Sequence, residues 1–327
     1  MGFTLVTVLG VLEVLARLWL AFDPTSNFHD GMIADPDPEI LLRPRPSAEA
    51  EVNSLGLRGP EPRENALRRV LVLGDSVTFG HDLSARASIP GHLAAELGPS
   101  WEVLNAGVLG YQTWQERRYL ERLDPILRPD VVVVVYCVND QRKVSPMVLN
   151  SAVLLRQTQL FERVQPSPVG LVGAFRMMRT LNEAARIRAE VEATTPVSVS
   201  WRGTWAEAWS ELLQRASRGR EALAVIVPSR DIVMSSVRET DGEVSELAAA
   251  AGADVVDPLA ALRRLPVELV FLPGDHIHLS SSGSEVVASV IAKWLRASPR
   301  ASSARRLRSS ILRSPDGLQR SPAPVAR

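Results

Sequence analysis

The sequence has little of several features that mark common classes of protein. It contains a single cysteine, Cys137, so no disulfide can form within the chain. No cluster of cysteine and histidine has the spacing of a zinc site. Lysine plus arginine and aspartate plus glutamate both number 37, so no net charge attracts the chain to nucleic acid. No Gly-x-Gly-x-x-Gly or phosphate-binding loop follows the first predicted strand, which disfavours a nucleotide-binding domain.

An apolar run lies at the start of the chain. Residues 2–22 are nearly all apolar, and about 20 such residues span a bilayer. Glu13 and Arg17 interrupt the run four residues apart, so they share a helix face and can pair. We expect residues 1–22 to form a single-pass membrane anchor or signal anchor; a soluble amphipathic helix and a cleaved signal peptide are the alternatives. The acidic, basic-poor residues after the run favour an extracytoplasmic position for the domain that follows.

The other end of the chain is basic. Residues 297–327 are rich in Arg, Ser, Pro and Ala, and their seven arginines face one aspartate. Such a segment buries too little apolar surface to offset the entropy of ordering, so we expect a basic disordered tail. Residues 23–67 are rich in Pro, Asp and Arg and carry turn signals throughout, which predicts an irregular linker packing on the next domain.

Strand and helix patterns alternate over residues 68–296, which predicts an α/β domain with a mostly parallel central sheet between helix layers. The run 131–136 is all apolar and mostly β-branched, so we place it in the middle of the sheet. Residues 141–200 fit this pattern least well and are predicted to be a helical insertion at one edge. Strands are predicted at 70–73, 101–104, 131–136, 222–227 and 253–256, and helices at 89–97, 113–123, 205–216, 242–250 and 282–296.

Three of the predicted strands end in residues of catalytic type, and the carboxyl ends of parallel strands meet at one crevice. Gly74-Asp75-Ser76 follows the first strand and would present the serine hydroxyl and backbone N–H there. Asn105-Ala106-Gly107 ends the second strand, where a glycine allows close approach and offers its N–H. Asn139-Asp140 follows the third, and an asparagine amide can donate to an oxyanion. Each motif alone is also compatible with an ordinary turn.

A fourth motif lies far downstream, just before the last predicted helix. Asp275 and His278 are three residues apart, so the carboxylate can accept a hydrogen bond from Nδ1–H of the imidazole. That contact would leave Nε2 free to take a proton from a serine. For this spacing alone, a loop with a surface histidine is the alternative, and His276 is the rival to His278.

In order and context the four motifs resemble those of the SGNH (GDSL-like) hydrolase family, over residues 69 to about 296. The resemblance implies a three-layer, flavodoxin-like fold. It implies a catalytic triad of Ser76, Asp275 and His278, and so selects His278 over His276. No metal and no organic cofactor is implied.

The same resemblance implies an oxyanion hole formed by the N–H of Ser76, the N–H of Gly107 and the side chain of Asn139. The neighbouring polar residues of the motifs would support these groups; they are Asp75, Asn105 and Asp140. Residues 53–61 (Asn-Ser-Leu-Gly-Leu-Arg-Gly-Pro-Glu) resemble the segment before the first strand in membrane-anchored bacterial members. Those members also carry an N-terminal apolar helix with a Glu and an Arg.

The activity that the resemblance implies is that of a serine esterase. The expected substrate is an O-acyl ester, acetyl above all, of a carbohydrate or another small molecule. An O-acyltransferase with the same triad is the nearest alternative, since a sugar hydroxyl could replace water in the second step. A membrane-tethered binding module that has lost activity is the alternative from another class. No nucleic-acid partner is expected, and the oligomeric state stays open.

Overall fold

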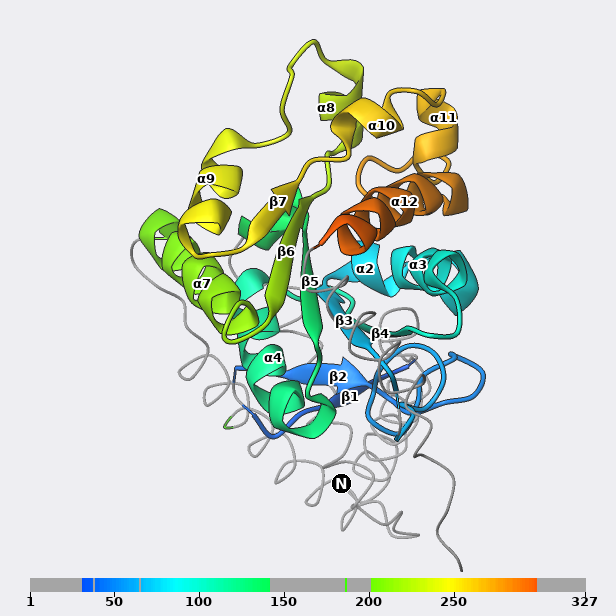
Figure 1. Ribbon diagram of the computed structural model, residues 1–327, viewed down its shortest axis with the longest axis vertical. Coiled ribbons are helices and arrows are strands. Elements are labelled where there is room, and N and C mark those ends of the chain that lie inside the picture. Colours follow the sequence, from blue (N-terminus) through cyan, green and yellow to red (C-terminus); the bar gives the residue numbers. More distant parts are fainter. Residues whose placement is uncertain (1–30, 38, 65, 142–185, 187–200, 299–327) are drawn as a thin grey trace, which may run out of the picture.

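Five parallel strands form the central sheet of the computed structural model, which describes residues 31–37, 39–64, 66–141, 186 and 201–298 (Figure 1). They lie close to the predicted positions and stand side by side in the order β4-β3-β5-β6-β7, so β5 is central, as predicted. Numbered along the chain, this is the 2-1-3-4-5 order of flavodoxin-like sheets. The strands are β3 (Arg69–Gly74), β4 (Glu102–Gly107), β5 (Val131–Tyr136), β6 (Glu221–Ile226) and β7 (Asp254–Val256).

The first strand of this sheet, β3, lies between β4 and β5. Val70 of β3 pairs with Val103 on one side and with Val131 on the other. The chain therefore builds outward from β3 in one direction and then, after β4, in the opposite direction. In open α/β sheets the crevice at such a reversal, at the carboxyl ends of the strands, is where ligands bind.

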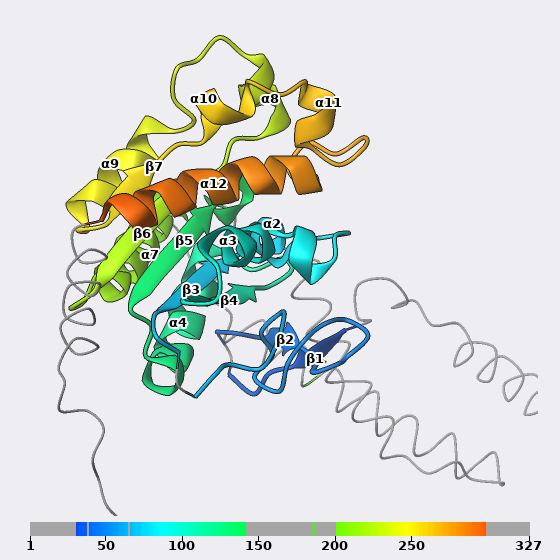
Figure 2. The ribbon, with the colours of Figure 1, turned by 45° about the vertical axis from the view of Figure 1, so that its right-hand side comes forward.

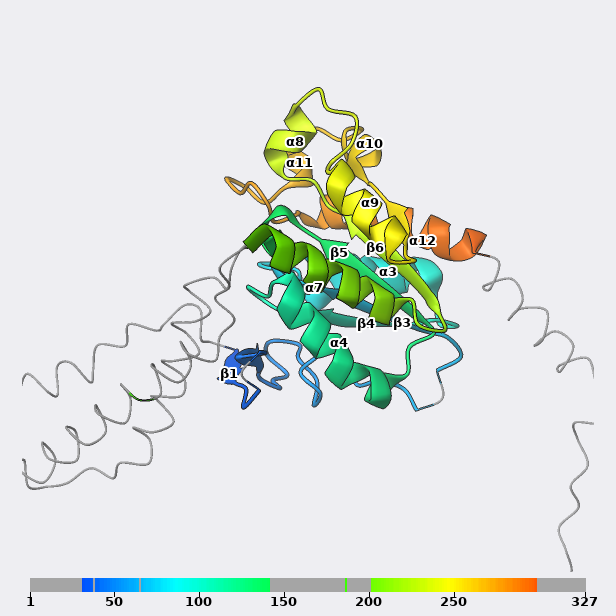
Figure 3. The same cartoon turned by 90° about the vertical axis from the view of Figure 1, so that its left-hand side faces the viewer.

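Helices cover both faces of the sheet (Figures 1 and 3). In β5, Val132 and Val134 belong to one apolar core, and Val131, Val133 and Val135 belong to the other. All five are fully buried, as expected for a strand whose alternate side chains both meet helices. The first core contains residues of α4 (Thr113–Leu127), α7 (Trp201–Ala216) and α9 (Gly242–Ala250); the second contains residues of α3 (Ile89–Leu97), α10 (Leu259–Leu262) and α12 (Ser281–Ala297).

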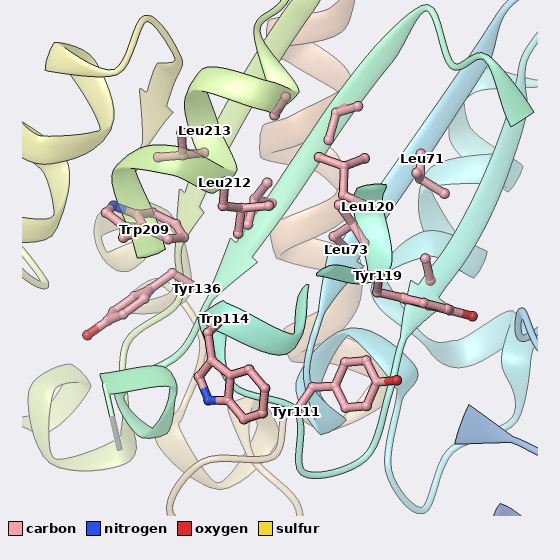
Figure 4. Packing of buried hydrophobic residues seen from close by; sticks show 14 of the residues in the cluster. Leu71, Leu73, Tyr111, Trp114, Tyr119, Leu120, Tyr136, Trp209, Leu212 and Leu213 are labelled. Carbon is pink, nitrogen blue, oxygen red and sulfur yellow. The ribbon is translucent and has the colours of Figure 1, made fainter. Parts of the chain in front are cut away.

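Aromatic side chains fill the core on the α4 and α7 side of the sheet (Figure 4). The ring of Trp209 lies 5.6 Å from that of Tyr136 at the end of β5, and Trp209 Nε1 donates to Val244 O at 3.2 Å. Tyr111 and Tyr119 meet edge to face, with ring centroids 5.7 Å apart. Such pairs have preferred geometries, so the first restrains how α7 lies over the strand that leads to Asn139, and the second restrains how the chain enters α4.

A strap formed by residues 31–61 crosses the start of α4 and the side of β4 (Figure 2). It contains β1 (Met32–Ala34) paired antiparallel with β2 (Leu42–Pro44), where the sequence predicts an irregular linker. Strands of three residues are too short to show an alternating pattern. The hydroxyl of Tyr111 donates to Leu42 O at 2.7 Å, and Gln115 Nε2 donates to Ile40 O at 2.9 Å, so the strap is bonded to the domain.

Several short helices have no counterpart in the prediction, because three to five residues show no helical periodicity. They are α2 (Ser76–Phe79), α8 (Arg230–Met234), α10 (Leu259–Leu262), α11 (Val267–Val270) and the 3₁₀ turns η1 (Ala85–Ala87) and η2 (Val138–Gln141). Among the residues that the structure describes, no helix is long and apolar enough to cross a membrane. The predicted anchor at 1–22, linker residues 23–30, the insertion from 142 to 200 apart from residue 186, and the tail beyond residue 298 lie outside the described residues.

Candidate active site

Ser76 stands where β3 gives way to α2. Asp75 is the N-cap of that helix, and its Oδ1 accepts from Val77 N at 2.8 Å. The turn is tight: a Cβ on Gly74 would lie 2.1 Å from Thr78 Oγ1, so only glycine fits there. As the first residue of α2, Ser76 points its N–H out of the helix, and this N–H has no acceptor within the described part of the chain.

The structure brings Ser76 and His278 together across 202 residues of sequence. Ser76 Oγ lies 2.9 Å from His278 Nε2, and His278 Nδ1 lies 2.7 Å from Asp275 Oδ2. His278 and Asp275 belong to the loop that precedes α12. That loop is closed by backbone hydrogen bonds between Leu272 and each of them, from Leu272 N to His278 O and from Asp275 N to Leu272 O. The three side chains therefore form one hydrogen-bonded line at the carboxyl end of β3.

Asp275 is held as a carboxylate. Burial alone would raise its pKa, but hydrogen bonds from the His278 ring and from the N–H groups of Ile277 and His278 outweigh it and lower the pKa to about 2. Since a carboxylate only accepts hydrogen bonds, Nδ1 of His278 must carry the proton of that contact. Nε2 of the neutral ring is then the acceptor that faces the Ser76 hydroxyl.

His276, the rival histidine, points elsewhere. Its side chain is 69% exposed, and its Nδ1 lies 3.8 Å from Asp231 Oδ1 at the surface. Its carbonyl accepts from Arg230 N at 2.8 Å, which ties the loop to α8. The structure thus places His278, not His276, against Ser76.

Asn139 and Asp75 form a hydrogen bond next to the nucleophile. Asn139 lies in η2, and its Nδ2 donates to Asp75 Oδ2 at 2.6 Å. Ser76 Oγ also lies 3.4 Å from the same carboxylate oxygen. Asp75 is fully buried, and this burial raises its pKa although the hydrogen bonds from Asn139 and Val77 oppose the shift. The bond to Asp75 therefore fixes the side-chain amide of Asn139 next to Ser76.

The structure corrects the role predicted for Gly107. Its N–H donates to Asn105 Oδ1 at 2.9 Å and is buried, so it does not face the crevice. Glycine is required here for packing: a Cβ would lie 2.2 Å from Phe79 N. The turn beyond, closed by Tyr111 N to Val108 O, contains Gly110 with φ 75°, and within the described part of the chain no acceptor meets its N–H. This turn adjoins the end of β3, because Val108 N donates to Gly74 O at 3.1 Å.

The other two residues predicted to support the site, Asp140 and Asn105, form hydrogen bonds with backbone groups next to it. Asp140 Oδ2 accepts from Cys137 N at 2.7 Å and closes the turn that carries Asn139. Asn105 Nδ2 donates to Thr78 O at 3.1 Å and to Phe79 O at 3.3 Å, at the end of α2. Both residues are buried, as side chains that satisfy buried backbone groups should be.

Sequence reasoning misses His81. Its ring centroid lies 4.6 Å from that of His278, tilted by 47°, and its side chain is 41% exposed. The position follows Gly80 in the loop after α2, and neither its spacing nor its neighbours distinguish it from any surface histidine. Only the contact with His278 reveals it.

Glu116 is the second residue that sequence reasoning misses. In the first turn of α4 it reads as an ordinary helix-start acid, yet it is fully buried and neither carboxyl oxygen has a hydrogen-bond partner among the described residues. Burial and the nearby Asp75 raise its pKa well above the usual range. Burial, Glu116 and Asp75 do the same for Asp140. Glu116, Asp140 and Asp75, the residue before the nucleophile, therefore repel one another as carboxylates, and protonation relieves this repulsion.

A sequence model of the GDSL-like Lipase/Acylhydrolase family matches residues 72–286, a stretch that runs from β3 into α12 and includes Ser76, Asp275 and His278. A search of curated protein sequences finds no match. Among the segments that the structure describes, no group of three or more His, Cys, Asp or Glu side chains could hold a metal ion.

Solved structures similar to this chain include three esterases or acylhydrolases. A lipase/acylhydrolase from Enterococcus faecalis is 18% identical, with 70% of this chain and 95% of that chain covered and a TM-score of 0.39. A carbohydrate acetylesterase family member from Sinorhizobium meliloti is 16% identical, with 70% and 97% covered and a TM-score of 0.38. The psychrotrophic esterase EstA from a Pseudoalteromonas species is 14% identical, with 70% and 99% covered and a TM-score of 0.41.

The raised pKa of Glu116 predicts how stability depends on pH. The folded protein holds a proton on Glu116 that the unfolded chain releases above about pH 4.3. The stability that this bound proton gives the folded state is fully present below that pH. It is lost as the pH rises towards the pKa that Glu116 has in the folded protein. Glu116→Gln needs no proton there, so it should gain stability relative to wild type between about pH 5 and 8 and match it near pH 4.

Urea denaturation at several pH values measures this difference. Glu246→Gln, at an exposed position on α9, is the matched control. A Glu116→Gln protein that instead loses stability relative to wild type as the pH rises would show that Glu116 is ionised in the fold.

Proposed function

The chain belongs to the GDSL-like lipase/acylhydrolase family and is a hydrolase that acts on ester bonds; from this premise we propose that it is a serine esterase with Ser76 as nucleophile. The observation that carries the proposal is the unbroken line of hydrogen bonds from Ser76 Oγ through the ring of His278 to Asp275. A serine hydroxyl is a weak nucleophile, and an imidazole held at 2.9 Å in the right tautomer is the base that activates it.

In the first step Ser76 Oγ attacks the carbonyl carbon of an ester while His278 Nε2 takes the hydroxyl proton. The carboxylate of Asp275 stabilises the imidazolium that forms. Collapse of the tetrahedral adduct breaks the bond to the alcohol oxygen, which receives the proton from Nε2 and leaves. Water then attacks the acyl-serine, gives its proton to His278, and releases the acid as Ser76 recovers its hydrogen.

The negative charge of each tetrahedral adduct needs donors that are already in place. The N–H of Ser76 suits this role because it opens α2 and has no acceptor in the described segments. The side-chain amide of Asn139 suits it because the bond to Asp75 holds that amide next to Ser76. We assign the third donor to the N–H of Gly110, since that of Gly107 is bonded to Asn105.

A small polar ester, an O-acetyl group on a carbohydrate, is the substrate class that we propose. The exposed side chains beside the Ser76–His278 pair support it. The ring of His81 contacts that of His278, and the next residue, Asp82, is 73% exposed. Imidazole and carboxylate groups can bond the hydroxyls of a sugar, whereas a long acyl chain would gain little from them.

Removing the nucleophile should abolish turnover and leave the fold intact. Ser76→Ala should lower kcat for p-nitrophenyl acetate by roughly 10⁶, because the triad acts as a unit. Ser84→Ala, at an exposed serine in the loop after α2, is the matched control and should behave as wild type. A fluorophosphonate probe should label wild type and the control but not Ser76→Ala. Substantial hydrolysis by Ser76→Ala, with an unchanged thermal unfolding curve, would rule out Ser76 as the nucleophile.

The substrate proposal predicts a preference for short acyl groups. We expect kcat/KM for p-nitrophenyl acetate to exceed that for p-nitrophenyl decanoate by at least about tenfold, since the polar side chains of His81 and Asp82 gain nothing from added methylenes. Acetate should also be released from an acetylated monosaccharide, which a coupled assay measures. Faster turnover of the decanoate would contradict the carbohydrate ester as substrate and favour a lipid ester.

We also propose that residues 1–22 anchor the enzyme in a membrane with its catalytic domain outside the cytoplasm, on the strength of their apolar length. Full-length protein should sediment with membranes and, in intact cells, react with a membrane-impermeant fluorophosphonate probe. A chain that lacks residues 1–22 should be soluble and keep its activity. Labelling only after cell lysis would reverse the orientation, and recovery of the full-length chain in the soluble fraction would exclude the anchor.

A further inference from the structure

The helix that begins with Ser76 is too short to satisfy its own carbonyl groups. It has four residues, and Ser76 O already accepts from the N–H groups of Gly80 and His81. The carbonyls of Thr78 and Phe79, at the end of the helix, need donors from elsewhere, because a helix leaves its last carbonyls unpaired. Where those donors stand decides how firmly α2 is held.

Two side chains from outside the helix supply the donors. Asn105 of β4 bonds the carbonyls of Thr78 and Phe79. Arg58 of the strap donates from Nη1 to Phe79 O at 2.8 Å and to Gly80 O at 2.6 Å, and from Nη2 to Leu83 O. Its guanidinium also stacks over the Phe79 ring, 4.4 Å from the centroid.

Arg58 is itself rigidly placed. Its backbone N–H donates to Asn105 O at 3.0 Å, so the strap is bonded to β4 at this residue. Its side chain is only 9% exposed, and Glu51 lies 3.7 Å from Nη2. The planar fork of a guanidinium can hold three carbonyls at once, which a lysine ammonium on a flexible stem cannot do in the same geometry.

The loop that Arg58 holds carries His81. The ring of His81 contacts that of His278, and Ser76 opens the helix whose end Arg58 bonds. One side chain of the strap is therefore connected to both members of the Ser76–His278 pair, through α2 on one side and through His81 on the other.

We propose that Arg58 is a positioning residue for the Ser76–His278 pair, which it aligns by holding the carbonyls of Phe79, Gly80 and Leu83. The proposal rests on the function proposed above. On this proposal residues 53–61 of the strap both cover the side of β4 and contribute a positioning residue to the active site.

Arg63, two residues beyond the strap, offers a control. It too donates to two backbone carbonyls, Pro99 O at 3.0 Å and Trp101 O at 2.6 Å, and it lies 3.4 Å from Glu102. These contacts are at the amino end of β4, whereas Asn105 and Gly107 are at the carboxyl end. Losing either arginine removes side-chain bonds to backbone carbonyls, but Arg63 is 47% exposed and only Arg58 is near Ser76.

The experiment compares Arg58→Ala, Arg58→Lys and Arg63→Ala in the full chain. Arg58→Ala should lower kcat for p-nitrophenyl acetate about 10²-fold with KM unchanged, the loss expected from misplacing reacting groups by about 1 Å. Arg58→Lys should recover part of kcat, and Arg63→Ala should lower the melting temperature but keep kcat. Equal kcat in Arg58→Ala and Arg63→Ala, or a change in KM alone, would overturn the proposal. If Arg58→Ala does not fold, Arg58→Lys is compared with Arg63→Ala. A lower kcat in Arg58→Lys supports the proposal, and equal kcat values overturn it.

A second readout does not depend on activity. NMR spectra of the histidine rings should show mutual ring-current shifts for His81 and His278 in wild type and Arg63→Ala, and their loss in Arg58→Ala. Unchanged shifts in Arg58→Ala would overturn the proposal even if kcat fell. A wild-type protein with no Ser76-dependent hydrolysis would instead overturn the proposed function, while the ring shifts would still report whether Arg58 holds the loop.

Discussion

The hydrogen bond between Ser76 Oγ and His278 Nε2 is the contact on which the rest of the site depends. Its two ends are 202 residues apart, so only the fold can supply it. The first strand of the sheet delivers the serine, and the loop before the last helix delivers the imidazole. Both arrive at the carboxyl end of β3 because the sheet is parallel and its chain order reverses there.

Around this contact the structure satisfies backbone groups with side chains rather than with more secondary structure. Asp75 caps the start of α2, Asn105 and Arg58 bond its end, and Asp140 closes the turn that carries Asn139. Side chains that bond buried backbone are costly to move, because each displaced group would be left unpaired away from water. The short helix and the short turn are thus held in place despite their length.

The carboxyl groups of the site fall into two environments with opposite consequences. Asp275 is partly exposed and accepts three hydrogen bonds, so it stays ionised and can support the imidazole. Glu116 and Asp140 are fully buried near Asp75, and their raised pKa values favour the neutral form. The carboxylate beside His278 is therefore charged, whereas the buried carboxyl groups near Asp75 favour the neutral form. Additional negative charge there would oppose the oxyanion that forms at Ser76.

The amino-acid sequence by itself determined the apolar runs of the five strands, the central place of β5, the Ser and Asn motifs at strand ends and the Asp-x-x-His motif before the last helix. The reason is that periodicity and local turn chemistry depend on neighbouring residues. Tertiary structure alone decided that the N–H of Gly107 is consumed by Asn105, that His81 meets His278, that Glu116 is buried and that Arg58 reaches α2. Which partner a donor finds, and whether a carboxyl group loses its water, depends on segments that pack together from distant parts of the chain.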